Sequence, residues 1–335
     1  MGELQAAKAA VRRLYEELDH APDAELARVM ERAVSADYTW RGVYPLDEIA
    51  EGSAVVDGFW LPLRNSLGPI QRREDIFMAG RSHTDGHMWV MSMGHLLGLF
   101  DRSWLGILPT GRMAFLRYAE FHRVADGRIA ETAFFCDIIG LMKQAGLAPL
   151  PLQTGEEIIV PGPRTQDGLL FDVQDEVETR KSAELANSLK DRLTTSYGTQ
   201  PSAELLATLW HEDMLWYGPS GIGSTYTIAR YREQHQIPFR DGLRDLVFNG
   251  HVCNFAEGNY AAWFGWPNLT GKPVGGFLGL PGSDARADLR VVDVYRREGD
   301  RLAENWVLID LLYWLKQQGV DVLARTAELS RLPAS

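Results

Sequence analysis

Two acidic residues, Glu120 and Asp293, occupy the same position in two copies of one segment and could act as general bases. Alternate side chains of a β-strand share a face, so Glu120 lies with Tyr118 and His122. If that face lines a pocket, burial among aromatic rings raises the pKa of the carboxylate. A base of this kind can remove a proton α to a carbonyl group.

The same alternation places Asp293 on one face with Val291 and Tyr295. The alternative for both acids is a surface carboxylate, either solvated or paired with an arginine. Arg123 and Arg296 are the arginines nearest to them in sequence. We favour the pocket interpretation, since both copies keep an acid at this position.

The two copies of the segment run from Tyr118 to Gly146 and from Val291 to Gly319 and align without a gap. Identical pairs are Arg123/Arg296, Arg128/Arg301, Ala130/Ala303, Glu131/Glu304, Asp137/Asp310, Lys143/Lys316, Gln144/Gln317 and Gly146/Gly319. A repeat of this length indicates that the chain contains one fold twice. Residues that both copies share therefore mark the requirements of the fold.

Two of the shared acids, Asp137 and Asp310, stand immediately before apolar helical segments. Aspartate is a preferred N-cap, because its carboxylate accepts hydrogen bonds from the first free N–H groups of a helix. We therefore favour capping over catalysis for this pair. Glu131 and Glu304 follow a hairpin on the last strand, where a solvated face is expected.

The histidines give no metal-binding pattern. His83 and His87 flank Thr-Asp-Gly and are expected to face each other across a hairpin, but no third ligand is evident. The other candidate hydrogen-bond donors in a pocket, with a purely structural role as the alternative, are His95, His211, His235 and His251. The sequence also lacks a phosphate-binding loop and a G-x-S-x-G nucleophile motif, so no cofactor and no metal are expected.

The composition is that of a folded globular protein, with 45% hydrophobic and 24% charged residues. A net charge of −11 argues against a nucleic-acid partner. The chain shows no signal peptide and no apolar run of about 20 residues, so we expect no membrane association and a cytoplasmic location.

Two domains are predicted, because 335 residues are more than one hydrophobic core usually organises. Their expected class is α+β, because helices precede a group of strands in each half. The expected boundaries are 1–147 for the first domain, 148–176 for a Pro/Gly-rich connector and 177–326 for the second domain. Within the connector, the run from Glu157 to Val160 is a candidate edge strand.

Several segments resemble the SnoaL-like polyketide cyclases, a family of the nuclear transport factor 2-like superfamily. The segments that carry this resemblance are GILPTGR (Gly106–Arg112), FHRVADGRIAE (Phe121–Glu131), WYGPSGIGS (Trp216–Ser224), YRREGDRLAENW (Tyr295–Trp306) and DLLYWLKQQG (Asp310–Gly319). The resemblance extends over nearly all of both halves. It implies two tandem cone-shaped α+β barrels, each a curved antiparallel sheet wrapped around helices with an apolar pocket at the wide end.

The resemblance also implies positions for the pocket residues. The histidine of the family falls on Glu120 and Asp293, and its catalytic aspartate falls on Phe134 and Val307. Neither Phe nor Val can transfer a proton, which leaves the two acids as the candidate bases. We favour Asp293 and the second pocket, because that half keeps more of the family's loop. The expected ligand contacts are Trp40, His95, Phe134, Trp216, Tyr217, Trp266 and Val307.

The function implied is cofactor-free acid/base chemistry on a hydrophobic carbonyl compound, such as aldol-type cyclisation, isomerisation or dehydration. The alternative is a non-catalytic protein that binds a small molecule or an interaction partner, which the loss of the usual aspartate favours. Related single-domain proteins pair through their sheets. The two halves are therefore expected to form an internal pseudo-dimer, and a homodimer of chains is left open.

Overall fold

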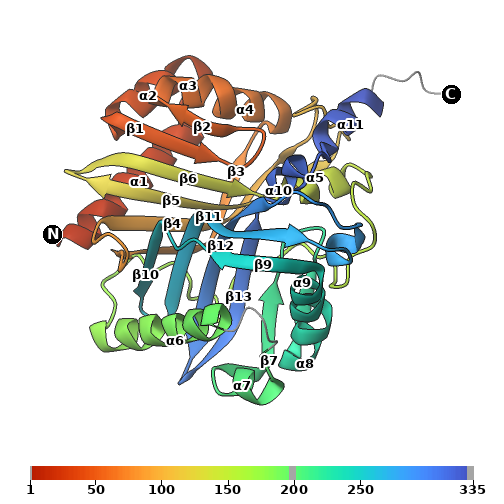
Figure 1. The fold of residues 1–335 in the computed structure, drawn as a ribbon. Coiled ribbons are helices and arrows are strands. Elements are labelled where there is room, and N and C mark those ends of the chain that lie inside the picture. Colours follow the sequence, from red (N-terminus) through yellow and green to blue (C-terminus); the bar gives the residue numbers. More distant parts are fainter. Residues whose placement is uncertain (1, 196–200, 330–335) are drawn as a thin grey trace.

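The computed structural model describes residues 2–195 and 201–329, which form two sheets, one in each half of the chain (Figure 1). The first sheet has the strand order β2-β1-β6-β5-β4-β3. The second has the order β10-β11-β12-β13-β7-β8, and β9 also pairs with β11. The two halves therefore repeat one α+β arrangement.

Helices precede most strands in the N-terminal half. The helices are α1 (Glu3–His20), η1 (Asp23–Glu25), α2 (Leu26–Ala33), α3 (Gly52–Val55), the π-helix η2 (Val56–Trp60), α4 (Leu61–Leu67) and α5 (Ile138–Gln144). The strands are β1 (Val34–Gly42), β2 (Asp47–Ala50), β3 (Gln71–Arg81), β4 (Met88–Leu99), β5 (Met113–Ala125) and β6 (Arg128–Cys136).

The C-terminal half repeats this order. Its helices are α6 (Glu176–Thr195), α7 (Ala203–Ala207), α8 (Thr227–Tyr231), the π-helix η3 (Arg232–Gln236), α9 (Ile237–Gly242), η4 (Phe277–Gly279), α10 (Leu311–Gln317) and α11 (Val322–Leu329). Its strands are β7 (Trp210–Tyr217), β8 (Ser224–Tyr226), β9 (Leu243–Phe248), β10 (Cys253–Glu257), β11 (Tyr260–Pro273), β12 (Ala287–Glu298) and β13 (Arg301–Ile309).

Both sheets are mixed rather than wholly antiparallel as the sequence indicated. Strands β3 to β6 form the predicted antiparallel meander, but β1 runs parallel to β6. In the second sheet β7 runs parallel to β13 in the same way. In each half the first strand arrives from the helical layer and joins the last strand of the meander.

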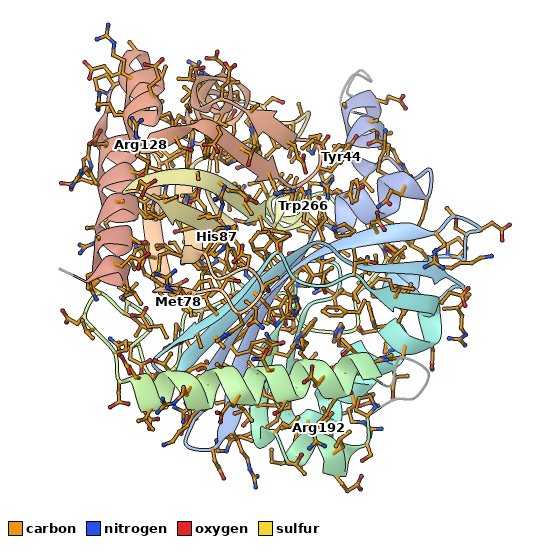
Figure 2. The ribbon with its side chains drawn as sticks, turned by 60° about the vertical axis from the view of Figure 1, so that its left-hand side comes forward. Tyr44, Met78, His87, Arg128, Arg192 and Trp266 are labelled. Carbon is orange, nitrogen blue, oxygen red and sulfur yellow. The ribbon has the colours of Figure 1, made fainter. Side chains whose placement is uncertain are left out.

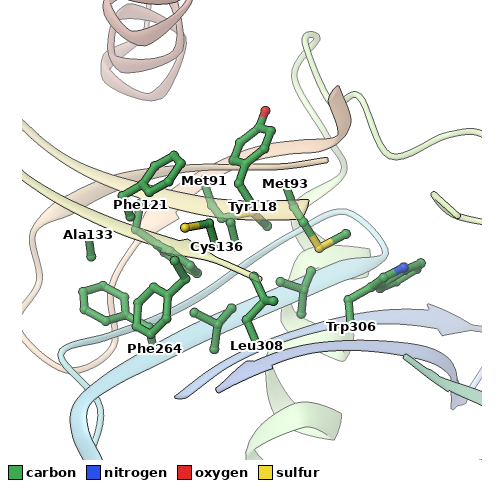
Figure 3. Close-up of a cluster of buried hydrophobic side chains, with 14 of the residues drawn as sticks. Met91, Met93, Tyr118, Phe121, Ala133, Cys136, Phe264, Trp306 and Leu308 are labelled. Atoms are coloured by element: carbon green, nitrogen blue, oxygen red, sulfur yellow. The ribbon is translucent and has the colours of Figure 1, made fainter. Parts of the chain in front are cut away.

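The two sheets face each other, with α1–α4 and α6–α9 on the outer sides (Figure 1). Aromatic rings fill the space between the sheets: the ring centroid of Phe264 lies 5.0 Å from that of Phe121 and 6.0 Å from that of Phe135. These residues belong to a continuous buried apolar cluster (Figure 3). Because strand side chains alternate, Glu120 points from the opposite face of β5, toward the helices of its own half.

Asp137 begins α5 and contacts both halves. Its Oδ1 accepts a hydrogen bond from the N–H of Gly140 at 2.8 Å, which confirms the predicted N-cap. Its Oδ2 accepts a second bond from the N–H of Ser220, at 2.9 Å, in the loop between β7 and β8. One carboxylate therefore caps a helix of the N-terminal half and holds a loop of the C-terminal half.

Asp310 makes the reciprocal contacts at the start of α10. Its Oδ1 accepts from the N–H of Tyr313 at 3.1 Å, again as predicted, and its Oδ2 accepts from the N–H of Tyr44 at 2.9 Å. Tyr44 lies in the loop between β1 and β2 of the other half. Burial raises the pKa of Asp310 to about 6, against the lowering effect of these hydrogen bonds and of Arg290.

The segment between α5 and α6 contains only isolated bridges. The predicted edge strand from Glu157 to Val160 is wrong: Glu156 alone bridges to Ser224. Side-chain contacts hold this segment in place of a backbone ladder: the Glu157 carboxylate lies 2.6 Å from Lys143 Nζ and accepts a bond from the hydroxyl of Ser220.

Replacing Asp137 tests the double role of the capping carboxylate. Asp137→Ala removes both bonds and should lower the free energy of unfolding by about 3 kcal/mol. Asp137→Asn keeps an oxygen for the cap but loses the acceptor for Ser220, and should lower it by about 1–2 kcal/mol. Urea denaturation measures both values. An Asn variant as stable as the native chain would show that the contact between the halves contributes nothing.

Candidate active site

A cavity of about 130 Å³ lies in the C-terminal half, between the sheet and the helices α6, α8, η3 and α9. Its apolar walls include Trp210, Trp216, Phe239, Trp263, Val291 and Val307. Its polar groups include Tyr231, His235, His251, Asp293, Tyr295 and Asn305. The cavity therefore combines aromatic walls with a cluster of groups that can exchange protons or hydrogen bonds.

Asp293 is the acid of this cavity. Its Oδ1 accepts hydrogen bonds from the hydroxyl of Tyr295 at 3.0 Å and from Nδ2 of Asn305 at 2.9 Å. The side chain forms no ion pair with any residue that the structure describes. Burial raises the pKa of Asp293 to about 7, although both hydrogen bonds act to lower it. The carboxyl group is therefore held in one orientation and changes its charge near neutral pH.

The strand register places the cavity walls beside this acid. Asp293 on β12 is the cross-strand neighbour of Val307 on β13 and of Trp263 on β11. Such neighbours have Cβ atoms about 5 Å apart. Val307, where the resemblance would place an aspartate, therefore provides an apolar contact directly next to Asp293.

His235 enters the cavity from the helical side. It lies in the π-helix η3, and its ring stacks on Trp216 with the centroids 3.9 Å apart. Burial, with Arg240 as a second cause, lowers the pKa of His235 to about 3. A neutral ring is therefore present at all physiological pH values. No sequence signal marked the π-helix, which arises where one extra residue widens a helical turn.

The corresponding space of the N-terminal half is filled by aromatic side chains. Trp40 and Phe134, both predicted to contact a ligand, instead pack around Phe59: its ring centroid lies 5.4 Å from that of Trp40 and 4.7 Å from that of Phe134. Tyr118 also stacks on Phe134, with centroids 6.0 Å apart. All four are buried core residues.

Glu120 has the opposite electrostatic environment to Asp293. Its Oε2 lies 3.6 Å from NH1 of Arg72 and 3.6 Å from Nε2 of His122. Burial favours the neutral acid, but His122 and Arg72 outweigh this effect and the pKa of Glu120 is lowered. The partner is Arg72 from β3, whereas Arg123 pairs with Glu131. Glu120 is therefore a charge-compensated core residue rather than a base of raised pKa.

Three other predicted ligand contacts lie outside the Asp293 cavity. His95 lies 3.4 Å from Asp75 and lines a separate cleft of about 270 Å³ between the halves, beside α5. Tyr217 stacks on Trp306 with centroids 5.5 Å apart. Both side chains contact other residues of the protein. Their positions on the predicted strands therefore did not show whether they line the Asp293 cavity.

Trp266 is the third of these residues and lies where the two halves meet (Figure 2). Its Nε1 donates to Oε1 of Glu48 at 3.0 Å, and its ring contacts Phe135 at a centroid distance of 5.4 Å. The guanidinium of Arg290 lies over the same ring at 3.9 Å. Of the predicted site residues, the structure brings Asp293, Trp216 and Val307 together in one cavity.

The described residues were also compared with the requirements of a metal site and of a membrane-spanning helix. Within residues 2–195 and 201–329, no group of three His, Cys, Asp or Glu side chains is arranged to hold a metal ion. The helices in these ranges lack the length and apolar character needed to cross a membrane. His211 contacts the carbonyl of Glu298 at 2.9 Å, away from the cavity.

A comparison with known proteins finds a family match for the half of the chain that contains this cavity. Residues 192–318 match the model of the SnoaL-like polyketide cyclases. The C-terminal half is therefore similar to the SnoaL-like polyketide cyclases over this stretch. It contains the complete second sheet and Asp293. No curated protein matches the sequence.

Several solved structures are similar to a part of this chain at low identity. One is a protein assigned to the SnoaL-like polyketide cyclases from Jannaschia sp. CCS1, with 19% identity and a TM-score of 0.35, covering 44% of this chain and 97% of that one. A second is an NTF2-like protein from Burkholderia thailandensis E264, with 19% identity, a TM-score of 0.31 and coverage of 42% and 98%. A third is an LEH-like epoxide hydrolase from M. tuberculosis, with 15% identity, a TM-score of 0.31 and coverage of 43% and 91%.

The raised pKa of Asp293 makes stability depend on pH. Between its ordinary pKa of 3.8 and about 7, the folded protein holds a proton that the unfolded chain has released. Stability attributable to this group therefore falls as the pH rises through this range and is constant above it. Asp293→Asn removes the dependence and should stabilise the protein by up to roughly 4 kcal/mol at pH 8, with little difference at pH 4.

Urea denaturation from pH 4 to pH 8 measures this difference. Asp300→Asn, at an exposed hairpin turn, serves as the control and should parallel the native protein. If the Asp293→Asn variant also keeps the native pH dependence, the acid is not held neutral by burial.

Proposed function

We propose that the SnoaL-like domain removes a proton from the carbon α to the carbonyl group of a hydrophobic compound, with Asp293 as the general base. The observation that carries this proposal is the position of a carboxylate with a pKa of about 7 among aromatic walls, held by Asn305 and Tyr295. A base is most effective when its pKa lies near the working pH, because it is then both ionised and strong enough to take the proton.

The free oxygen of Asp293 defines where the proton is taken. Oδ1 is occupied by Tyr295 and Asn305, whereas Oδ2 accepts no hydrogen bond from any residue that the structure describes. The α-hydrogen of a bound substrate would approach Oδ2. The two donors on Oδ1 keep the carboxyl group from rotating as its charge changes, so its geometry is the same before and after transfer.

The cavity favours a compact substrate. Its volume of about 130 Å³ is close to that of cavities that hold a single six-membered ring. The stacked pair of Trp216 and His235 offers a flat apolar surface for such a ring. Aldol-type cyclisation, isomerisation and dehydration all begin with loss of an α-proton, so the proposal applies to each of them.

Exchange of α-hydrogens with deuterium tests the base directly. Compact ketones such as cyclohexanone should exchange in D₂O in the presence of the native protein, as followed by proton NMR. Asp293→Asn should lower the exchange rate by roughly 10²- to 10⁴-fold, since the amide cannot accept the proton. Glu120→Gln changes the matching acid of the other half and should leave the rate within about twofold of native.

Two results would contradict the proposal in different ways. Undiminished exchange by Asp293→Asn would show that another group is the base. Binding of the ketones without any exchange would instead support the non-catalytic, ligand-binding alternative.

The pH dependence of exchange follows from the same pKa. Only the ionised carboxylate accepts a proton, so the exchange rate should rise with pH and level off above a midpoint near 7. The rate between pH 5 and pH 9, divided by the rate of the buffer alone, gives the profile. A midpoint near 4 would mean that the carboxylate is solvated during the reaction.

A further inference from the structure

One histidine of the cavity, His251, has no part in the proton transfer proposed above. It lies in the short segment between β9 and β10, two strands that both pair with β11. The corresponding edge strand of the N-terminal half, β3, continues through this region with one register shift between Glu74 and Ile76. The edge of the sheet is therefore opened in the half that contains the cavity, and the opening holds His251.

The ring of His251 is fixed beside the base. It lies on Trp263 with the centroids 4.2 Å apart, and Phe248 contacts it edge-on at 5.1 Å. Trp263 is the cross-strand neighbour of Asp293. His251 and Asp293 thus line the same cavity from adjoining positions.

A hydrogen bond from Asn268 determines which ring nitrogen carries the proton. Nδ2 of Asn268 lies 3.1 Å from Nδ1 of His251 and also donates to the carbonyl of Gly250 at 3.1 Å. The carbonyl of Gly250 can only accept, so the Asn268 side-chain atom that faces it must be the NH₂ nitrogen. An NH₂ group can only donate, so Nδ1 must be the acceptor. The proton of the neutral ring is therefore on Nε2.

Asn268 itself is held by the backbone of the sheet. It is buried, and it lies in the bulge of β11 between Gly265 and Leu269. A Cβ atom at Gly265 would lie 2.5 Å from the Cβ of Asn268, so this close approach requires glycine. The carbonyl of Asn268 also accepts from the N–H of Asn249 at 2.8 Å, which ties the His251 segment to the bulge.

The Nε2–H group is a donor without an acceptor. Nε2 is buried and has no hydrogen-bond partner among the residues that the structure describes. Burial, with Lys190 as a second cause, lowers the pKa of His251 to about 3, so the ring stays neutral and keeps this tautomer. A buried donor left unpaired is unfavourable, and an oxygen atom of a ligand in the cavity would satisfy it.

The geometry points to Nε2–H of His251 as the group that holds the carbonyl oxygen of the substrate, an inference that rests on the proposed proton transfer. Asp293 Oδ2 takes the α-proton, and the electron pair of the broken C–H bond forms a C=C bond. The π pair of the carbonyl moves onto its oxygen, and this enolate oxygen accepts the bond from Nε2–H. His251 touches the reacting oxygen, and Asn268 is the positioning residue that sets its tautomer.

This assignment narrows the substrate class. The compound must present a carbonyl oxygen to His251 and an α-hydrogen to Asp293 within one small cavity, as a compact cyclic ketone does. A neutral donor stabilises the enolate without protonating it, because an imidazole N–H is a very weak acid. The proton can therefore return from Asp293 to a different carbon, or the enolate can attack a second carbonyl group.

The tautomer can be observed in the native protein. In protein with ¹⁵N-labelled histidine, the ring nitrogen shifts of His251 should show a protonated Nε2 and a bare Nδ1, unchanged from pH 5 to pH 9. Asn268→Ala removes the fixed donor and should shift the signals toward a mixture of tautomers. A native ring protonated at Nδ1, or one that titrates in this range, would overturn the assignment.

Binding of an enolate mimic tests the donor itself. The probe is 4-nitrophenolate at pH 8, studied in the Asp293→Asn background, which imitates the protonated acid present beside the enolate. Adding His251→Phe keeps the ring on Trp263 but removes the N–H group. It should weaken 4-nitrophenolate binding by roughly 10- to 100-fold, the range for a hydrogen bond to a charged oxygen.

The matched probe 4-nitrotoluene has the same ring without the oxygen anion. Its affinity should change less than about twofold on adding His251→Phe, which excludes a general loss of the cavity. Equal effects on both probes, or none on 4-nitrophenolate, would overturn the inference. These measurements use no turnover, so failure of the proposed function, seen as exchange that survives Asp293→Asn, remains a separate result.

Discussion

The arrangement of the two halves depends on a pair of aspartates that each serve two backbones. Asp137 caps α5 and binds the N–H of Ser220 across the boundary, while Asp310 caps α10 and binds the N–H of Tyr44 in return. The start of α5 is therefore joined to a loop of the C-terminal half, and the start of α10 is joined to a loop of the N-terminal half. With the apolar rings between the sheets, this reciprocity fixes how the two cones are oriented.

The loops held by these aspartates lead directly into the elements of the cavity. Ser220 lies between β7, which carries Trp216, and β8, which precedes the helices α8, η3 and α9. A contact made by the N-terminal half thus positions the strand and helix that carry Trp216 and His235. The N-terminal half influences the cavity through backbone geometry rather than through a side chain in it.

Glu120 and Asp293 occupy equivalent positions, but their different neighbours give the two carboxylates different roles. In the N-terminal half His122 and Arg72 keep Glu120 charged, and aromatic rings occupy the remaining space. In the C-terminal half Asp293 has hydrogen-bond donors but no cation beside it among the residues that the structure describes, so burial has the largest effect on its pKa. A compensated charge stabilises a core, whereas an uncompensated one in a cavity is available for chemistry.

The sequence predicted the features that depend on local pattern. The repeat, the α+β order, the capping aspartates and the shared face of Asp293, Val291 and Tyr295 all follow from spacing along the chain, and the structure contains each of them. The sequence did not show that Arg72 would compensate Glu120, because that contact joins different strands. It also could not show the opening between β9 and β10, since the break depends on the bulge of β11 around Asn268.

Packing the two sheets against each other inside one chain has a consequence for their symmetry. In a dimer of identical subunits, a mutation that fills one cavity fills its twin as well, so both sites are kept or both are lost. Covalent linkage of two copies removes this coupling and supplies the partner surface at a fixed, high effective concentration. One copy can then keep Phe121 and Phe135 for its partner while Trp40 and Phe134 close its own interior.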